Sequence, residues 1–139
     1  MKVFLSYGPA DQKAATALAE ALAAEGFSVW DPATEILPGD NHGRLVGEAL
    51  EEAEGMVVLV SPGSMQSPSV QRDISYALTK LQYAGRLVPV IVKPARRMPW
   101  ILERFPQVPW TGDVQGVARE VAGWLEKGYR LAKVRLQPA

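Results

Sequence analysis

The 139-residue sequence contains no cysteine. This absence excludes disulfide bonds, thiolate nucleophiles and cysteine-ligated zinc, and it fits a reducing compartment. No run approaches the roughly 20 apolar residues of a membrane-spanning helix. The residues after Met1 also lack the apolar core of a secretory signal. We therefore expect a cytoplasmic protein with no membrane partner.

The sequence also lacks an excess of either charge, because 15 basic side chains balance 15 acidic ones. Without a global positive field, we expect no nucleic-acid partner. The single histidine, His42, has no second ligand at a usable spacing, so we expect no metal site. What the sequence does have is a 47% apolar content, which is typical of a folded globular domain.

Short apolar runs alternate with segments whose apolar residues have helical spacing. The runs lie at 3–6, 27–30, 56–60, 87–92 and 108–110, and a long loop is expected at 33–41. Strands that alternate with helices form parallel sheets with helices on both faces. We therefore predict an α/β fold, a flavodoxin-like three-layer sandwich with a central five-stranded parallel sheet. Residues 1–127 form the predicted domain, and 128–139 form a C-terminal tail or helical extension.

Four segments, in order, carry a resemblance to a known family. They read VFLSY (3–7), GFSVWD (26–31) followed by LPGD (37–40), VVLVSPGS (57–64) and RLVPVIV (86–92). Their order and spacing resemble the conserved boxes of TIR (Toll/interleukin-1 receptor) domains over nearly the whole chain. The resemblance implies signalling by self-association with other TIR domains. Some members of the family cleave NAD⁺, so the resemblance also implies NAD⁺ cleavage as an alternative activity.

A response-regulator receiver domain has a similar alternation of strands and helices. A receiver needs acidic residues at the end of its first strand and an aspartate at the end of its third, whereas this chain has Ser6-Tyr7 and Ser61-Pro62 there. The chain also lacks the Gly-x-x-x-x-Gly-Lys-Ser/Thr pattern of a P-loop. The sequence therefore argues against both phosphoryl-transfer classes.

Asp73 is the candidate catalytic residue. In TIR domains that cleave NAD⁺, the resemblance implies a catalytic glutamate four residues beyond a tryptophan, in the pattern Ser-Pro-Trp-x-x-x-Glu. Here Ser69 stands at the tryptophan position and Asp73 at the glutamate position, and an i, i+4 pair shares one side of a helix. The side chain of aspartate is one methylene shorter than that of glutamate, which withdraws the carboxylate from the site. A misplacement of a catalytic group by about 1 Å costs on the order of 100-fold in rate. The alternative is a solvated helix residue that pairs with an arginine.

Ligands of open α/β sheets bind outside the carboxyl ends of the strands. The resemblance therefore points to a nucleotide site lined by Ser6, Tyr7, Trp30, Ser64 and Ser69. Ser6 and Tyr7 can equally be turn residues. For Trp30, packing is favoured over stacking on a base.

The resemblance gives the loop after the second strand a role as a self-association surface and as a gate beside the nucleotide cleft. This assembly loop comprises Ile36, Leu37, Pro38, Gly39 and Asp40. An exposed Ile36-Leu37 pair would support that role, because apolar residues on a loop tip have little structural purpose. The structural alternative is a turn that also caps the next helix.

Two functions follow. The first is a TIR signalling module that acts by self-association with other TIR domains. The alternative is an NAD⁺ glycohydrolase or cyclase that releases nicotinamide, with Asp73 in place of the usual glutamate. NAD⁺ is then a substrate, and no cofactor is expected.

Overall fold

The computed structural model describes residues 1–83 and 85–136, with side chains for residues 1–83 and 85–128. Within them, five parallel strands form one sheet in the order β2-β1-β3-β4-β5. The strands are β1 (Lys2–Ser6), β2 (Ser28–Trp30), β3 (Gly55–Val60), β4 (Leu87–Ile91) and β5 (Val108–Pro109). Each coincides with a predicted apolar run to within one or two residues.

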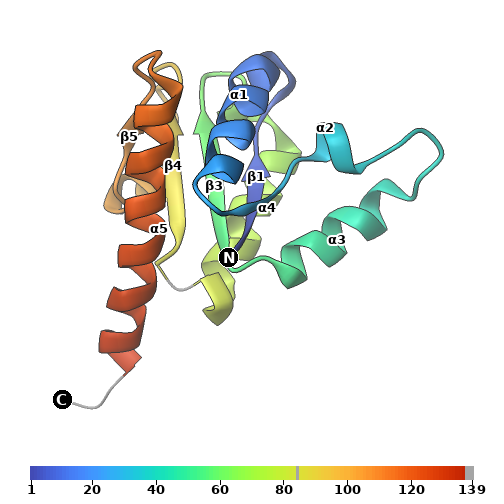
Figure 1. The fold of residues 1–139 in the computed structure, drawn as a ribbon. Coiled ribbons are helices and arrows are strands. Elements are labelled where there is room, and N and C mark those ends of the chain that lie inside the picture. Colours follow the sequence, from blue (N-terminus) through green and yellow to red (C-terminus); the bar gives the residue numbers. More distant parts are fainter. Residues whose placement is uncertain (84, 137–139) are drawn as a thin grey trace.

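Helices cover both faces of this sheet (Figure 1). Residues of α1 (Gln12–Ala24) and α5 (Val114–Leu136) share one apolar core, and residues of α3 (His42–Glu52) and α4 (Pro68–Thr79) share the other. Short 3-10 turns include η1 (Pro9–Asp11), η2 (Ser64–Gln66), η3 (Leu81–Tyr83) and η4 (Trp100–Arg104). The predicted flavodoxin-like α/β sandwich is confirmed.

Side chains alternate between the two cores along each strand, as the pleat requires. On β1, Val3 and Leu5 belong to the core under α1 and α5, whereas Phe4 belongs to the core under α3 and α4. On β3, Val57 and Leu59 face α1 and α5 in the same way. The alternation then directs the residues at the two strand ends, Ser6 and Ser61, to opposite faces of the sheet.

The segment expected to be a long loop at 33–41 contains a short helix, α2 (Pro32–Glu35). Asp31 caps this helix, because its side chain accepts a hydrogen bond from the Ala33 backbone N–H, and Pro32 fits the first helical turn. The cap of α3 is Asn41, whose side chain accepts from the Arg44 N–H, and not Asp40. The turn and the cap are therefore made by different residues.

The last helix, α5, runs without a break from Val114 to Leu136 and so crosses residue 128, where we predicted a tail or extension to begin. In Figure 1 its C-terminal end extends past the neighbouring elements. Gly128 is buried against the backbone of Gly85, in the connection that leads to β4. No helix in the described part of the chain combines the length and the apolar character needed to cross a membrane.

Gly128 gives a stability prediction. A Cβ atom at this position would overlap the carbonyl oxygen of Gly85, and backbone atoms yield less readily than a flexible side chain. We expect Gly128→Ala to lower the free energy of unfolding by about 1–3 kcal/mol. Gly123, on the same helix, has open space around it, so Gly123→Ala is expected to raise stability by about 0.5–1 kcal/mol. Urea denaturation of both variants measures the difference, and equal effects would contradict the close approach.

Candidate functional site

A cleft of about 620 Å³ opens at the carboxyl end of β1, between α2 and α3 on one side and α4 on the other. This volume lies within the range of small-molecule sites. Ser6, Tyr7, His42, Ser69, Arg72 and Asp73 supply its ionisable and hydroxyl groups. We call it the β1–α4 cleft.

A hydrogen bond connects the carboxylate of Asp73 on α4 to β1. The Ser6 hydroxyl donates a hydrogen bond to Asp73 Oδ2 over 2.8 Å, and Ser6 is almost completely buried. Ser6 faces α4 because it lies two residues after Phe4 on the same side of β1. Asp73 is half-buried. Among the described side chains, Asp73 is thus hydrogen-bonded to Ser6 and forms no ion pair with an arginine.

The environment of Asp73 makes it an unusually basic carboxylate. Burial raises its pKa from the ordinary 3.8 to about 6, while the Ser6 hydrogen bond and the positive charges of Arg72 and His42 act in the opposite direction. The group is thus mostly ionised above neutral pH and gains a proton as the pH falls below 6. Perturbed carboxylates of this kind are common where proteins perform chemistry.

A second hydrogen bond ties the β1 turn to α2. Tyr7 Oη donates to Asp31 Oδ1 over 2.6 Å, and the Ala33 backbone N–H donates to the same oxygen over 2.9 Å. Burial, together with the bond to Asp31, raises the pKa of Tyr7 well above its usual range. Asp31 is buried and shapes the cleft wall, although the sequence marked it only as the end of a strand.

The crevice between β1 and β3, where ligands of doubly wound sheets usually bind, is filled by the protein itself. The Ser61 hydroxyl donates to Asp11 Oδ2 over 2.6 Å, and the Ser64 backbone N–H donates to the Ser61 hydroxyl over 3.2 Å. Gly8 packs so closely on Ser64 that a Cβ atom would lie 3.3 Å from the Ser64 Cα. These residues form a wall beside the β1–α4 cleft.

Four of the predicted site residues come together in the β1–α4 cleft: Ser6, Tyr7, Ser69 and Asp73. Ser69 is exposed, and its hydroxyl lies 3.1 Å from the Ser67 hydroxyl.

Trp30 and Ser64 do not line the cleft. Trp30 stacks on Phe4 with ring centroids 5.1 Å apart, so it is held in the core under α3. Ser64 is buried in the wall, where its hydroxyl accepts from the Ser61 N–H.

The sequence did not indicate that His42 and Arg72 would line the cleft. His42 lies there because Asn41 starts α3 immediately before it, and Arg72 precedes Asp73 on α4. Both are cations, or can become cations, beside the carboxylate. In the described part of the chain, no group of three or more potential ligands is arranged to hold a metal ion.

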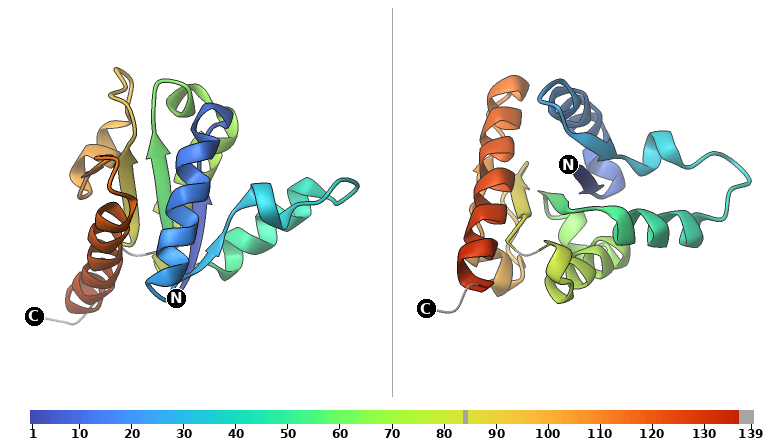
Figure 2. Two further views of the ribbon diagram at one scale, coloured as in Figure 1. Left: turned by 45° about the horizontal axis from the view of Figure 1, so that its top comes forward. Right: turned by 60° about the horizontal axis from the view of Figure 1, so that its bottom comes forward.

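The assembly loop projects from the body of the molecule together with α2 and α3 (Figures 1 and 2). Leu37 is 63% exposed, whereas Ile36 is half-buried. The loop turns back on itself, because the Leu37 N–H donates to Asp40 Oδ2 over 2.8 Å and the Asp40 N–H donates to the Leu37 carbonyl over 3.1 Å. Gly39 has a φ of 91°, which favours glycine at this position.

Comparison with known proteins agrees with this fold. The family model described as "TIR domain" matches residues 3–126. This chain belongs to the TIR domain family. No curated protein matches this TIR domain significantly.

Solved structures share its fold at low sequence identity. The TIR domain of the Toll-related receptor TRR-2 from Hydra magnipapillata superimposes with a TM-score of 0.69 and 18% identity, covering 94% of this chain and 97% of that one. A TIR-STING receptor from C. gigas, solved with 2′,3′-cGAMP, gives 0.73 and 20%, covering 88% of this chain and 38% of the receptor. The CMP N-glycosidase BcmB from Clostridium botulinum gives 0.58 and 13%, covering 89% of this chain and 100% of that one.

The raised pKa of Asp73 predicts a pH-dependent stability. With a pKa of about 6 in the folded chain against an ordinary 3.8, the folded state binds this proton more tightly than the unfolded chain does. Ionisation of Asp73 therefore lowers the free energy of unfolding above pH 6, and this effect is lost as the pH falls towards 4. We expect Asp73→Asn to raise the free energy of unfolding by about 1–3 kcal/mol at pH 8 and to change it little at pH 4.

Urea denaturation at the two pH values measures this effect. Glu120→Gln, at an exposed site on α5, is the matched control and is expected to change stability by less than about 0.5 kcal/mol. If the Asp73→Asn variant is instead less stable than the natural protein at pH 8, burial is not the dominant influence on the pKa of Asp73.

Proposed function

We propose that this TIR domain is a cytoplasmic signalling module that self-associates with other TIR domains through the assembly loop, residues 36–40. The exposure of Leu37 carries this proposal, because a large apolar side chain on a projecting tip has no core to join in the isolated chain. The two hydrogen bonds between Leu37 and Asp40 hold the tip in one shape. Burial of a leucine side chain against a partner removes its apolar surface from water and stabilises association by about 1.5–3 kcal/mol.

Association predicts a specific effect of a charge at the tip. We expect the average mass of the natural protein in sedimentation experiments to rise with concentration, and Leu37→Glu to weaken association by about 10-fold or more. Leu81→Glu is the matched control, since Leu81 is 81% exposed but lies in η3, after α4. A natural protein that stays monomeric at high concentration would refute the proposal. Equal weakening by both variants would refute the role of the loop.

A second candidate function is the hydrolysis or cyclisation of NAD⁺ in the β1–α4 cleft, favoured by the Ser6–Asp73 hydrogen bond. Departure of nicotinamide breaks the ribosyl C–N bond and leaves a cationic, oxocarbenium-like centre, which a fixed carboxylate stabilises. Water then adds to that centre to give ADP-ribose and a proton, or the adenine ring closes on it to give a cyclic product. The structural neighbour named as a CMP N-glycosidase breaks a bond of the same kind on this fold.

The surroundings of Asp73 suit this chemistry in two ways. Ser6 fixes one carboxylate oxygen at 2.8 Å, which orients the carboxylate and restricts its motion. Arg72 and His42 lie beside the carboxylate in the same cleft, where they can bind the pyrophosphate of the substrate. Tyr7, held by Asp31, closes another part of the wall.

The enzyme hypothesis predicts nicotinamide release by the purified domain, clustered on a scaffold, at pH 7.5. We expect Asp73→Asn to reduce the rate by about 100-fold or more, and we expect the rate to fall as the pH drops through about 6, where Asp73 becomes protonated. Chromatography of released nicotinamide is the measurement, with Glu120→Gln as the control. If Asp73→Glu releases nicotinamide and the natural protein does not, this TIR domain is a scaffold rather than an enzyme.

A further inference from the structure

A second pocket, of about 560 Å³, opens at the same edge of the sheet on the other side of the wall. The β3–β5 pocket, as we name it, lies between the start of α1 and the ends of β3, β4 and β5. Its polar and aromatic residues are Asp11, Lys13, Ser61, Lys93 and Trp110. It shares no lining residue with the β1–α4 cleft. Any ligand here is therefore bound by different side chains from those proposed to bind NAD⁺.

Backbone hydrogen bonds hold the walls of this pocket. The Val92 and Lys93 N–H groups both donate to the Val60 carbonyl, over 2.9 and 3.2 Å, so the end of β4 stays next to the end of β3. The Trp110 N–H donates to the Ile91 carbonyl over 3.0 Å. The backbones of Lys93 and Trp110 thus have fixed positions in the isolated chain, so ligand binding does not lose entropy by ordering these backbones.

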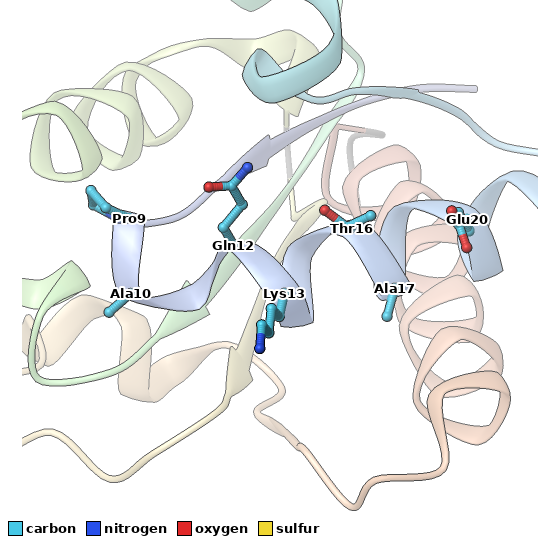
Figure 3. Close-up of a pocket in the computed structure, with 7 residues that line it drawn as sticks. All are labelled: Pro9, Ala10, Gln12, Lys13, Thr16, Ala17 and Glu20. Atoms are coloured by element: carbon cyan, nitrogen blue, oxygen red, sulfur yellow. The ribbon is translucent and has the colours of Figure 1, made fainter.

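Two lysines, Lys13 and Lys93, and a single carboxylate, that of Asp11, line the β3–β5 pocket. The side chain of Lys13 extends from α1 on the same side as that of Ala10 and on the opposite side from that of Gln12 (Figure 3). Across the described side chains, neither Lys13 nor Lys93 belongs to an ion pair. Both are exposed and available to an anion, and the pocket has a net charge of about +1 after Asp11 is counted.

Asp11 and Trp110 add two further means of recognition. Asp11 is 6% exposed, its Oδ2 accepts from Ser61, and its side chain does not cap α1, so Oδ1 can accept from a ligand hydroxyl. Trp110 is half-buried against the core. An indole in this position offers an aromatic surface for stacking.

We propose that the β3–β5 pocket binds a nucleoside monophosphate. The phosphate lies between Lys13 and Lys93, a ribose hydroxyl donates to Asp11, and the base packs on Trp110. A free phosphate makes no use of Trp110 and is repelled by Asp11. An uncharged nucleoside makes no use of the two lysines. A ligand that combines an aromatic base, hydroxyl donors and a phosphate matches all of these side chains.

Titration of the full chain with AMP, followed by amide NMR and calorimetry, tests this proposal. We expect shifts centred on Ser61, Lys93 and Trp110, and at least about 10-fold weaker binding of adenosine, ribose 5-phosphate and inorganic phosphate. Lys93→Ala is expected to weaken AMP binding by about 10-fold, and Lys93→Arg to retain it. Lys2→Ala is the matched control, because Lys2 starts β1 at the opposite edge of the sheet.

Three results would overturn the proposal. If AMP does not bind at millimolar concentration, the β3–β5 pocket is not a nucleotide site. If the amide shifts are confined to Ser6, Arg72 and Asp73, AMP binds in the β1–α4 cleft instead. Inorganic phosphate that binds as tightly as AMP reduces the pocket to a simple anion site. Nicotinamide release depends on Asp73 and is measured separately, so failure of this proposal is distinguishable from failure of the enzyme hypothesis.

Discussion

The hydrogen bond from Ser61 to Asp11, with its counterpart from Ser6 to Asp73, determines how the carboxyl edge of this sheet is arranged. Both bonds follow from the pleat. Ser6 ends β1 on the side of α4, and Ser61 follows β3 on the side of α1, so each serine reaches the aspartate of a different layer. The first bond closes the central crevice of the fold. Space for ligands is left on either side of it, in the β1–α4 cleft and the β3–β5 pocket.

Much of the fold was predictable because each buried strand is a continuous apolar run and each helix has a clear apolar stripe. The short helix α2 was missed, since four residues are too few for a periodic pattern and the signal was only the Asp31-Pro32 cap. Family resemblance indicated Ser6 and Asp73 separately. Their bond spans 67 positions and depends on how α4 packs against β1, which no local pattern reveals. The stacking of Trp30 on Phe4 could not be predicted from the sequence either, because it depends on the pairing of β1 with β2.

The assembly loop and the β1–α4 cleft are connected through the same two helices. Pro32 and Ala33 of α2 line the cleft, and the loop connects the C-terminal end of α2 to the N-terminal end of α3, where His42 also lines the cleft (Figure 2). Asp31 anchors the near end of α2 to Tyr7. Leu37 is therefore separated from the cleft residues His42 and Ala33 by only a few residues on either side. The proposed association surface and the proposed small-molecule site thus share the two helices α2 and α3 as their framework.

The turn that Asp40 closes on Leu37 has a further consequence, for the entropy of association. A disordered loop loses backbone freedom worth about 1–2 kcal/mol per residue when a partner immobilises it. Here the side chain of Asp40 and the conformation of Gly39 fix that backbone before any partner arrives. The free energy gained by burying Leu37 is then not offset by the ordering of its own loop.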